Sequence, residues 1–394
     1  MKISVKELFI KTEEQRNWLE KLKTLELPIK ESAQVNDEQS LFPHDNINKL
    51  REIGYTKVTL PKEYGGDGFN IYDAILLQET LGSYDGSTAL SIGWTLLTVG
   101  DVFETKNWPK EKLNEFAKAV VNGAIINKIV SEVITGSPIR GGRPGTSAVK
   151  KSNKWVINGR KAYATCSPEL DYFLVTAWIP EIESTGNFLI HKNAKGLSIE
   201  ETWDTVAMKA TGSHDLVLEN VEVDESDLVE IPNYQTGFKL NGWLLIIPAT
   251  YLGIAQAARD YAVEFANHHS PNSIQGTIAT LPNVQSLIGE IDLLLAQARF
   301  TLYGAAQSYI ELINKGNLAA QEAGNIVNAV NVAKYTVTNN AIAIVDKAMR
   351  VVGAKSLQRN NPLQRYYRDV RAGLHNPPMD DLTIKKLAES ALKL

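Results

Sequence analysis

The spacing of apolar side chains changes twice along the chain. From residue 1 to about 125, apolar positions recur three or four residues apart, as in Leu90, Trp94 and Leu97, which is the spacing of one face of an α-helix. Between about 126 and 235 the apolar residues gather instead in short runs such as 172–178, rich in β-branched and aromatic side chains and bounded by turn-forming residues. This second pattern is typical of β-strands.

From about residue 236 onward the chain returns to long, alanine-rich helical patterns, notably over 284–312 and 321–352. Long, weakly polar helices usually pack against one another as a bundle. The sequence therefore predicts an α+β fold with three domains. These are an N-terminal α-helical domain (1–125), a middle β-barrel or β-sandwich domain (126–235) and a C-terminal four-helix-bundle domain (236–394).

Composition narrows the classes of partner and site. The chain has 41 Lys and Arg against 45 Asp and Glu, a net charge of -4, with no basic block that would attract nucleic acid or an anionic membrane. No stretch approaches the roughly 18 uninterrupted apolar residues of a membrane span. A single cysteine, Cys166, and six scattered histidines offer no disulfide and none of the usual zinc patterns. We expect a cytoplasmic protein without a metal.

Four groups of residues share their order and spacing with one family. They are LPKEYGGDG (60–68) followed by QETLGSYDGS (78–87); VSEVITGS (130–137); VINGRKAYATCS (156–167) with WDTVAMKATGSHD (203–215); and VVGA (351–354) followed by PLQRYYRD (362–369). With the order helix, strand, helix, they resemble the acyl-CoA dehydrogenase superfamily over nearly the whole chain. The resemblance implies that family's fold and a flavin-dependent oxidoreductase.

The group at 130–137 resembles the family loop that carries backbone and hydroxyl donors to the flavin. By this resemblance Ser131 would face the pyrimidine edge of the ring and Ser137 the pyrophosphate, with Val130 and Gly136 in the same loop. A reduced flavin carries negative charge near N1, and a glycine lets the backbone approach a pyrophosphate closely. The loop is thus predicted to bind the cofactor.

The group at 156–167 resembles the family strand that lies beside the flavin ring. The aromatic residue there is usually tryptophan and is Tyr163 in this chain, whereas Thr165 matches the threonine whose hydroxyl reaches flavin N5. A hydrogen bond at N5 tunes the atom that accepts hydride or reacts with oxygen. We therefore expect both residues in the cofactor site.

Two further cofactor contacts come, in the family, from a neighbouring subunit. Gly353 and Ala354 match a glycine pair that approaches the dinucleotide, which implies a homotetramer built as a dimer of dimers. His268 stands near the place where many relatives have an arginine on the pyrophosphate, and histidine is the weaker phosphate partner. FAD is the expected cofactor, and weak retention or use of FMN is the alternative.

The chain departs from the family where the catalytic glutamate usually stands. Counting from Arg368, that position falls on or beside Pro377, which cannot take a proton, and the family's other base position falls near Trp243. The ionisable residues nearest the first position are His375 and Asp380. His375 suits acid or base chemistry near neutral pH, with a helix-end cap as the alternative, and Asp380 could equally cap the last helix.

The leading functional hypothesis is oxidation of an acyl-CoA or similar acyl substrate, with hydride transfer to flavin N5 and His375 or Asp380 as the base. A rival is a two-component monooxygenase that receives reduced flavin from a reductase, since the run 371–378 resembles the histidine-bearing segment of such enzymes in the superfamily. A third hypothesis is a flavin-binding scaffold without turnover. The sequence names neither the substrate nor the electron acceptor or flavin reductase.

Overall fold

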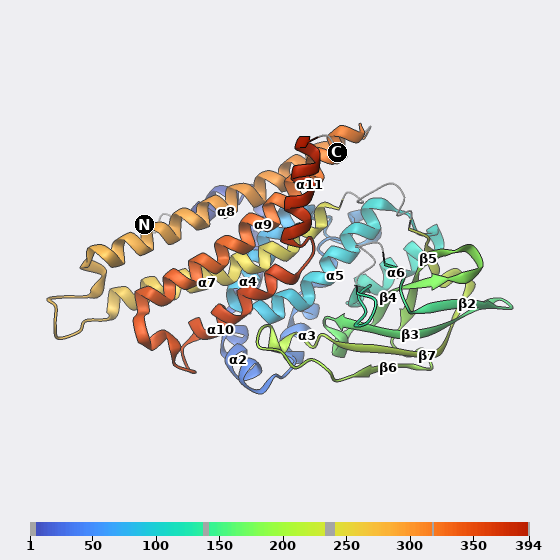
Figure 1. The fold of residues 1–394 in the computed structure, drawn as a ribbon, viewed down its shortest axis with the longest axis horizontal. Coiled ribbons are helices and arrows are strands. Elements are labelled where there is room, and N and C mark those ends of the chain that lie inside the picture. Colours follow the sequence, from blue (N-terminus) through green and yellow to red (C-terminus); the bar gives the residue numbers. More distant parts are fainter. Residues whose placement is uncertain (1–4, 137–141, 233–240, 317–318, 393–394) are drawn as a thin grey trace.

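The computed structural model describes residues 5–136, 142–232, 241–316 and 319–392. Helices, then strands, then helices follow one another, which confirms the α+β class; the exact domain boundaries stay a prediction (Figure 1). The helices are α1 (Glu13–Lys23), α2 (Glu26–Gln39), α3 (His44–Glu52), α4 (Ile71–Tyr84), α5 (Gly86–Thr105), α6 (Lys110–Val121), α7 (Ile246–His268), α8 (Pro282–Lys315), α9 (Ala320–Val352), α10 (Pro362–Asp369) and α11 (Asp380–Leu392). The strands are β1 (Ile126–Ile129), β2 (Ser147–Lys151), β3 (Lys154–Ala164), β4 (Tyr172–Ile179), β5 (Ser184–His191), β6 (Leu197–Glu200), β7 (His214–Asp224) and β8 (Leu228–Glu230).

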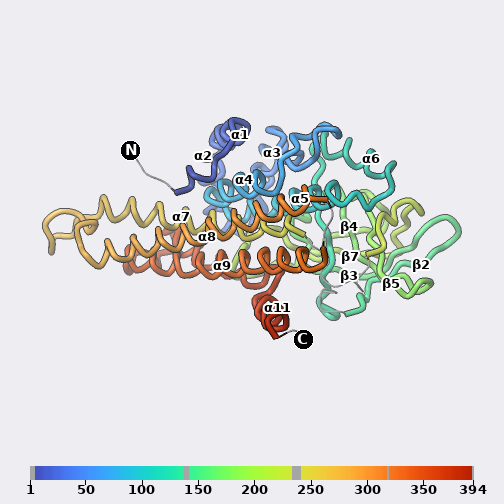
Figure 2. Tube along the Cα trace, turned by 90° about the horizontal axis from the view of Figure 1, so that it is seen from above, coloured from blue at the N-terminus to red at the C-terminus, as the bar shows by residue number. Residues whose placement is uncertain are grey.

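Helices α4 and α5 form the buried centre of the N-terminal part. Both are apolar around most of their circumference, as expected of helices covered on several sides. Asp85 ends α4 and caps α5, because its carboxylate accepts a hydrogen bond from the Thr88 amide at 2.8 Å. This break turns the chain so that α4 packs on α7 and α8, whereas α5 reaches towards the sheet (Figures 1 and 2).

The eight described strands form one connected sheet. The order is β6-β7-β3-β2-β4-β5-β8, and β1 pairs with β4 in parallel. The long strands β3 and β7 run antiparallel, with irregular register near both Gly159 and the end of β3. Strand β1 lies against α5, where the Thr95 hydroxyl donates to Ile126 O at 3.0 Å, and this contact joins the sheet to the helical part of the molecule.

Helices α7, α8 and α9 lie side by side and make the C-terminal bundle (Figure 2). A buried ion pair ties this bundle to α4, because Arg299 in α8 donates to Glu79 at 2.7 Å and 2.9 Å. Burial alone would raise the pKa of Glu79, but the charges of Arg299 and Lys6, together with hydrogen bonds from Arg299 and Tyr303, outweigh it and lower the pKa. None of the described helices is long and apolar enough to cross a bilayer.

Candidate functional site

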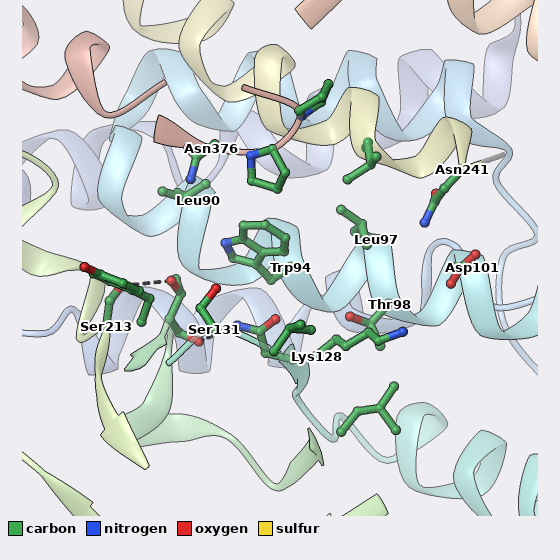
Figure 3. A pocket seen from close by; sticks show the side chains of 18 of the residues that line it. Leu90, Trp94, Leu97, Thr98, Asp101, Lys128, Ser131, Ser213, Asn241 and Asn376 are labelled. Carbon is green, nitrogen blue, oxygen red and sulfur yellow. Dashed lines mark hydrogen bonds between the residues drawn. The ribbon is translucent and has the colours of Figure 1, made fainter. Parts of the chain in front are cut away.

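A cavity of about 1940 Å³ lies where the three parts of the chain meet. One stripe of α5 forms a wall, with Leu90, Trp94, Leu97, Thr98 and Asp101 at helical spacing (Figure 3). The opposite walls come from the ends of β1 and β3, from the segment 203–213 and from 367–382. Figure 3 shows Ser131 and Ser213 towards one end of the cavity and Asp101 at the other.

The end of β3 has an unusual backbone at this cavity. Tyr163 has φ +60° and Cys166 φ +68°, a left-handed conformation that non-glycine residues adopt at a cost. Backbone hydrogen bonds hold the turn, since the Cys166 amide donates to Thr211 O at 3.0 Å and the Ser167 amide to Gly212 O at 3.2 Å. The turn leaves the Tyr163 side chain 61% exposed in the cavity wall.

Three hydroxyl groups next to this turn are linked by hydrogen bonds into a chain. Thr165 Oγ1 lies 2.8 Å from Ser213 Oγ, which lies 2.8 Å from Thr211 Oγ1, and that hydroxyl donates to Met208 O at 2.9 Å. Asn127 Nδ2 donates to the Thr165 carbonyl at 3.0 Å and fixes it to β1. Figure 3 draws the bond from Ser213 as a dashed line. All three hydroxyl residues line the cavity.

The loop after β1 is anchored by Glu132. Its carboxylate accepts hydrogen bonds from Lys161 Nζ at 2.7 Å, from the Thr146 amide at 3.0 Å and hydroxyl at 2.7 Å, and from the Thr135 hydroxyl. Burial would raise the pKa of Glu132, but these donors outweigh it and lower the pKa to about 2. The loop backbone at Ser131 is thereby held at the cavity.

The segment 367–382 supplies the remaining wall. His375 and Asn376 line the cavity, as do Pro377 and Pro378, and the Tyr251 hydroxyl donates to Asn376 Oδ1. The prediction that His375 faces a site is thus matched by its position. Its role in a reaction stays a prediction.

Asp380 is engaged elsewhere. Its carboxylate accepts from Lys334 Nζ at 3.0 Å and from Asn339 Nδ2 at 3.0 Å, at the start of α11, and it does not belong to the described cavity wall. Two acidic residues do line that wall, Asp101 on α5 and Glu230 on β8. Glu230 accepts from Asn187 Nδ2 at 2.8 Å.

The residues expected to come from a second subunit lie away from the cavity. His268 ends α7 with its Nδ1 2.8 Å from Glu264 O, and Gly353 and Ala354 are exposed after α9. Within one chain the structure does not bring them to the other site residues, so their contact with a cofactor stays a prediction. Ser137 lies outside the described residues.

The residues at the cavity fit the flavin that the resemblance implies. Val130, Ser131, Tyr163 and Thr165 all line it, whereas Gly136, with φ +70°, has open space where a Cβ would be. The wall thus offers hydroxyl groups, a flat aromatic ring and a fixed backbone, the groups that bind a ring with both polar and apolar edges. No group of His, Cys, Asp and Glu suited to a metal occurs among the described residues.

Sequence reasoning did not single out Asn127, Thr211 or Ser213. The residues T-G-S at 211–213 lie within the family-like segment 203–215, which indicates the fold and not a site. One signal for Asn127 is present in the sequence, because this amide lies between the apolar residues Ile125 and Ile126 on one side and Ile129 and Val130 on the other.

Comparisons with known proteins agree with this arrangement. Three family models match: acyl-CoA dehydrogenase, N-terminal domain (12–104), middle domain (129–221) and C-terminal domain (245–376). The chain is 54% identical to YdbM of Bacillus subtilis (strain 168), a protein named for the acyl-CoA dehydrogenases, over 98% of this chain and 99% of YdbM.

Three solved structures share the fold at identities that carry no further conclusion. Butyryl-CoA dehydrogenase from Megasphaera elsdenii has a TM-score of 0.85 and 18% identity, with 100% of both chains covered. FMN-bound TdsC from Paenibacillus sp. A11-2 has 0.86 and 22%, covering 95% and 97%. Methanesulfinate monooxygenase MsuC from Pseudomonas fluorescens has 0.84 and 20%, covering 95% and 96%. By its three matching domains and its 54% identical relative, this chain belongs to the acyl-CoA dehydrogenase family of flavoprotein oxidoreductases.

Proposed function

We propose that this protein is a flavin-dependent monooxygenase that works with reduced flavin supplied by a separate reductase. The observation that carries the proposal is the wall at 375–378. Where the family usually has a glutamate, this wall presents an imidazole, an amide and two prolines, without a carboxylate. Monooxygenation does not need a carboxylate to remove a proton from carbon.

Dehydrogenation of an acyl thioester does need such a base beside the reacting carbon, within hydrogen-bond reach of the proton. The three acidic candidates are poorly placed for it. Asp380 is held by Lys334, and Glu230 by Asn187. Asp101 lies at the end of the cavity opposite Ser131 and Ser213 (Figure 3). It follows Leu90 by eleven residues on α5, which is about 16 Å along the helix at 1.5 Å per residue.

The chain's own residues would hold the substrate and control its protons. Trp94, Leu97 and Leu174 give the cavity an apolar lining that excludes water and favours an apolar or aromatic substrate body. Within the described residues, Thr98 Oγ1 and Asn127 Oδ1 are buried without a hydrogen-bond partner. These two atoms would form hydrogen bonds with a polar group of the substrate.

Bound reduced flavin would supply the two electrons for the reaction. One atom of O₂ then enters the substrate, the other leaves as water, and the flavin ends oxidised. His375 is placed to deliver or take up the proton that accompanies this transfer. We also propose that the flavin is FAD or FMN and that the protein assembles as a homotetramer.

The test supplies the purified protein with NADH, FMN and a flavin reductase, and screens aromatic and sulfur-containing compounds for product. We expect product only when both reductase and oxygen are present. In parallel, oxidised flavoprotein is mixed without oxygen with a panel of acyl-CoA thioesters. Bleaching of the flavin by one thioester would contradict the proposal.

The second candidate is an acyl-CoA dehydrogenase with His375 as the base, which the name of the 54% identical relative favours. It predicts that bleaching. A protein that binds flavin but gives neither result would support the third alternative, a scaffold without turnover.

A further inference from the structure

We infer that Thr211 and Ser213 are positioning residues that make Thr165 a hydrogen-bond acceptor towards the cavity, and so give the site a preference for reduced over oxidised flavin. This inference rests on the proposed function, because it assumes that a flavin ring lies against Thr165. It concerns a chain of hydroxyl groups that runs from the Met208 carbonyl through Thr211 and Ser213 to Thr165 in the cavity wall. Ser213 is labelled in Figure 3.

The direction of the chain follows from counting protons. A carbonyl oxygen only accepts, so in the bond to Met208 O the Thr211 hydroxyl is the donor. Each hydroxyl has one proton, and therefore Ser213 must donate to Thr211, and Thr165 must donate to Ser213. With its proton committed, Thr165 Oγ1 offers only lone pairs to a molecule in the cavity.

The chain is protected from competing partners. Thr211 is 0% exposed, Ser213 4% and Thr165 7%, which leaves little access for water. The two segments that carry these residues are joined by the backbone bonds from Cys166 and Ser167 to the 211–212 carbonyls. Buried, fully paired polar networks of this kind hold their geometry.

Flavin N5 changes its hydrogen-bonding character with redox state. Oxidised flavin has an unprotonated N5 that accepts a hydrogen bond, whereas fully reduced flavin has an N5–H group that donates one. An accepting Thr165 therefore complements the reduced form and faces the oxidised form with lone pair against lone pair. Reversing the chain would require Thr211 to give up its bond to Met208 O. The wild-type site should thus bind reduced flavin more tightly.

The experiment measures the dissociation constants of oxidised and chemically reduced FMN, the latter without oxygen, by titration of the purified protein. The readout is the ratio of the two constants, because a general structural defect weakens both forms alike. Ser213→Ala frees the Thr165 proton, so we expect the preference for reduced FMN to fall about tenfold, the value of one hydrogen bond.

Thr211→Val removes the fixed donor and should shift the ratio the same way, which keeps the test decisive if Ser213→Ala does not fold. Thr211→Ser keeps the hydroxyl and should keep the preference. The matched control is Thr185→Val in β5, a buried hydroxyl without a partner among the described residues and outside the cavity wall. It should leave the ratio unchanged.

Two results would overturn the inference. If the variants bind FMN with the wild-type ratio, the hydroxyl chain does not set the preference, although the proposed function stands. If wild-type protein prefers oxidised flavin, the inferred direction is wrong. Failure of the wild type to bind either form would instead count against the proposed function itself.

Discussion

The two sides of the cavity are built in different ways. The side formed by β1, β3 and 203–213 is held by a buried ion pair, a chain of hydroxyl groups and backbone bonds between segments. On the opposite side, His375 is exposed and the described residues give it no hydrogen-bond partner. The first side carries the residues that we propose to bind a flavin, and the second presents His375, Asn376 and two prolines at 375–378, without a carboxylate. Cofactor binding and reaction type can therefore diverge within one fold.

The largest expected effect comes from a substitution at Lys161, in the side of the cavity formed by β1, β3 and 203–213. Lys161→Met would leave the buried Glu132 carboxylate without its partner, which typically costs about 3–5 kcal/mol. Denaturant unfolding of the variant should show this loss, together with weaker flavin binding. Lys150→Met is the control, because its pair with Glu225 is exposed and such pairs contribute roughly 1 kcal/mol or less. Equal losses of unfolding free energy in both variants would show that the Lys161–Glu132 pair contributes no more to stability than an exposed pair.

A second effect concerns Asp369, which links the two sides through a 2.6 Å hydrogen bond from the Met208 amide. Burial raises the pKa of Asp369 to about 7, above its value of 3.8 in the unfolded chain. Between these values the folded state holds a proton that the unfolded state has lost, so this group lowers the free energy of unfolding as pH rises.

At about 1.4 kcal/mol per pKa unit, the contribution amounts to a few kcal/mol. Unfolding of wild type and Asp369→Asn from pH 4 to 7 measures it as the difference between two curves. The wild type should lose stability relative to the variant as pH increases. Parallel curves would show that Asp369 titrates normally.

The smallest effect on stability, together with a large effect on turnover, is expected at His375 in the wall formed by 367–382. His375→Ala should leave flavin binding and stability nearly unchanged and slow product formation about hundredfold, the lower range for a general acid or base. Asp380→Asn is the comparison, since its carboxylate is paired with Lys334 outside the cavity wall. It should lower stability more than His375→Ala does, because the buried Lys334 ammonium loses its charged partner, and change turnover less than twofold. A reversed pattern would assign the proton transfer to Asp380.

Much of the fold was predictable because apolar spacing reports helices and strands directly. The change of period near 126 and again near 236 matches the start of β1 at Ile126 and of the helical stretch at Gly242. The motifs predicted Ser131, Tyr163 and Thr165 as cofactor contacts. All three line the cavity, and their contact with a cofactor stays a prediction.

The remaining features of the site depend on contacts between residues that are far apart in the sequence. The bond between Thr165 and Ser213 requires the antiparallel pairing of β3 with β7 and two left-handed residues that are not glycine. Nothing in the local sequence signals such a backbone. The pairing of Asp380 with Lys334 likewise joins α11 to α9 across 46 positions, so the sequence left Asp380 open as a base.

The central claim, that a proposed flavin-binding side is combined with a wall suited to oxygen chemistry, is tested most directly by isotope labelling. The complete system with reductase would be run under ¹⁸O₂ with the compound that gives product in the screen, and the product analysed by mass spectrometry. The account predicts one ¹⁸O atom in each product molecule and the second in water. A product without label, formed equally well in the absence of oxygen, would contradict it.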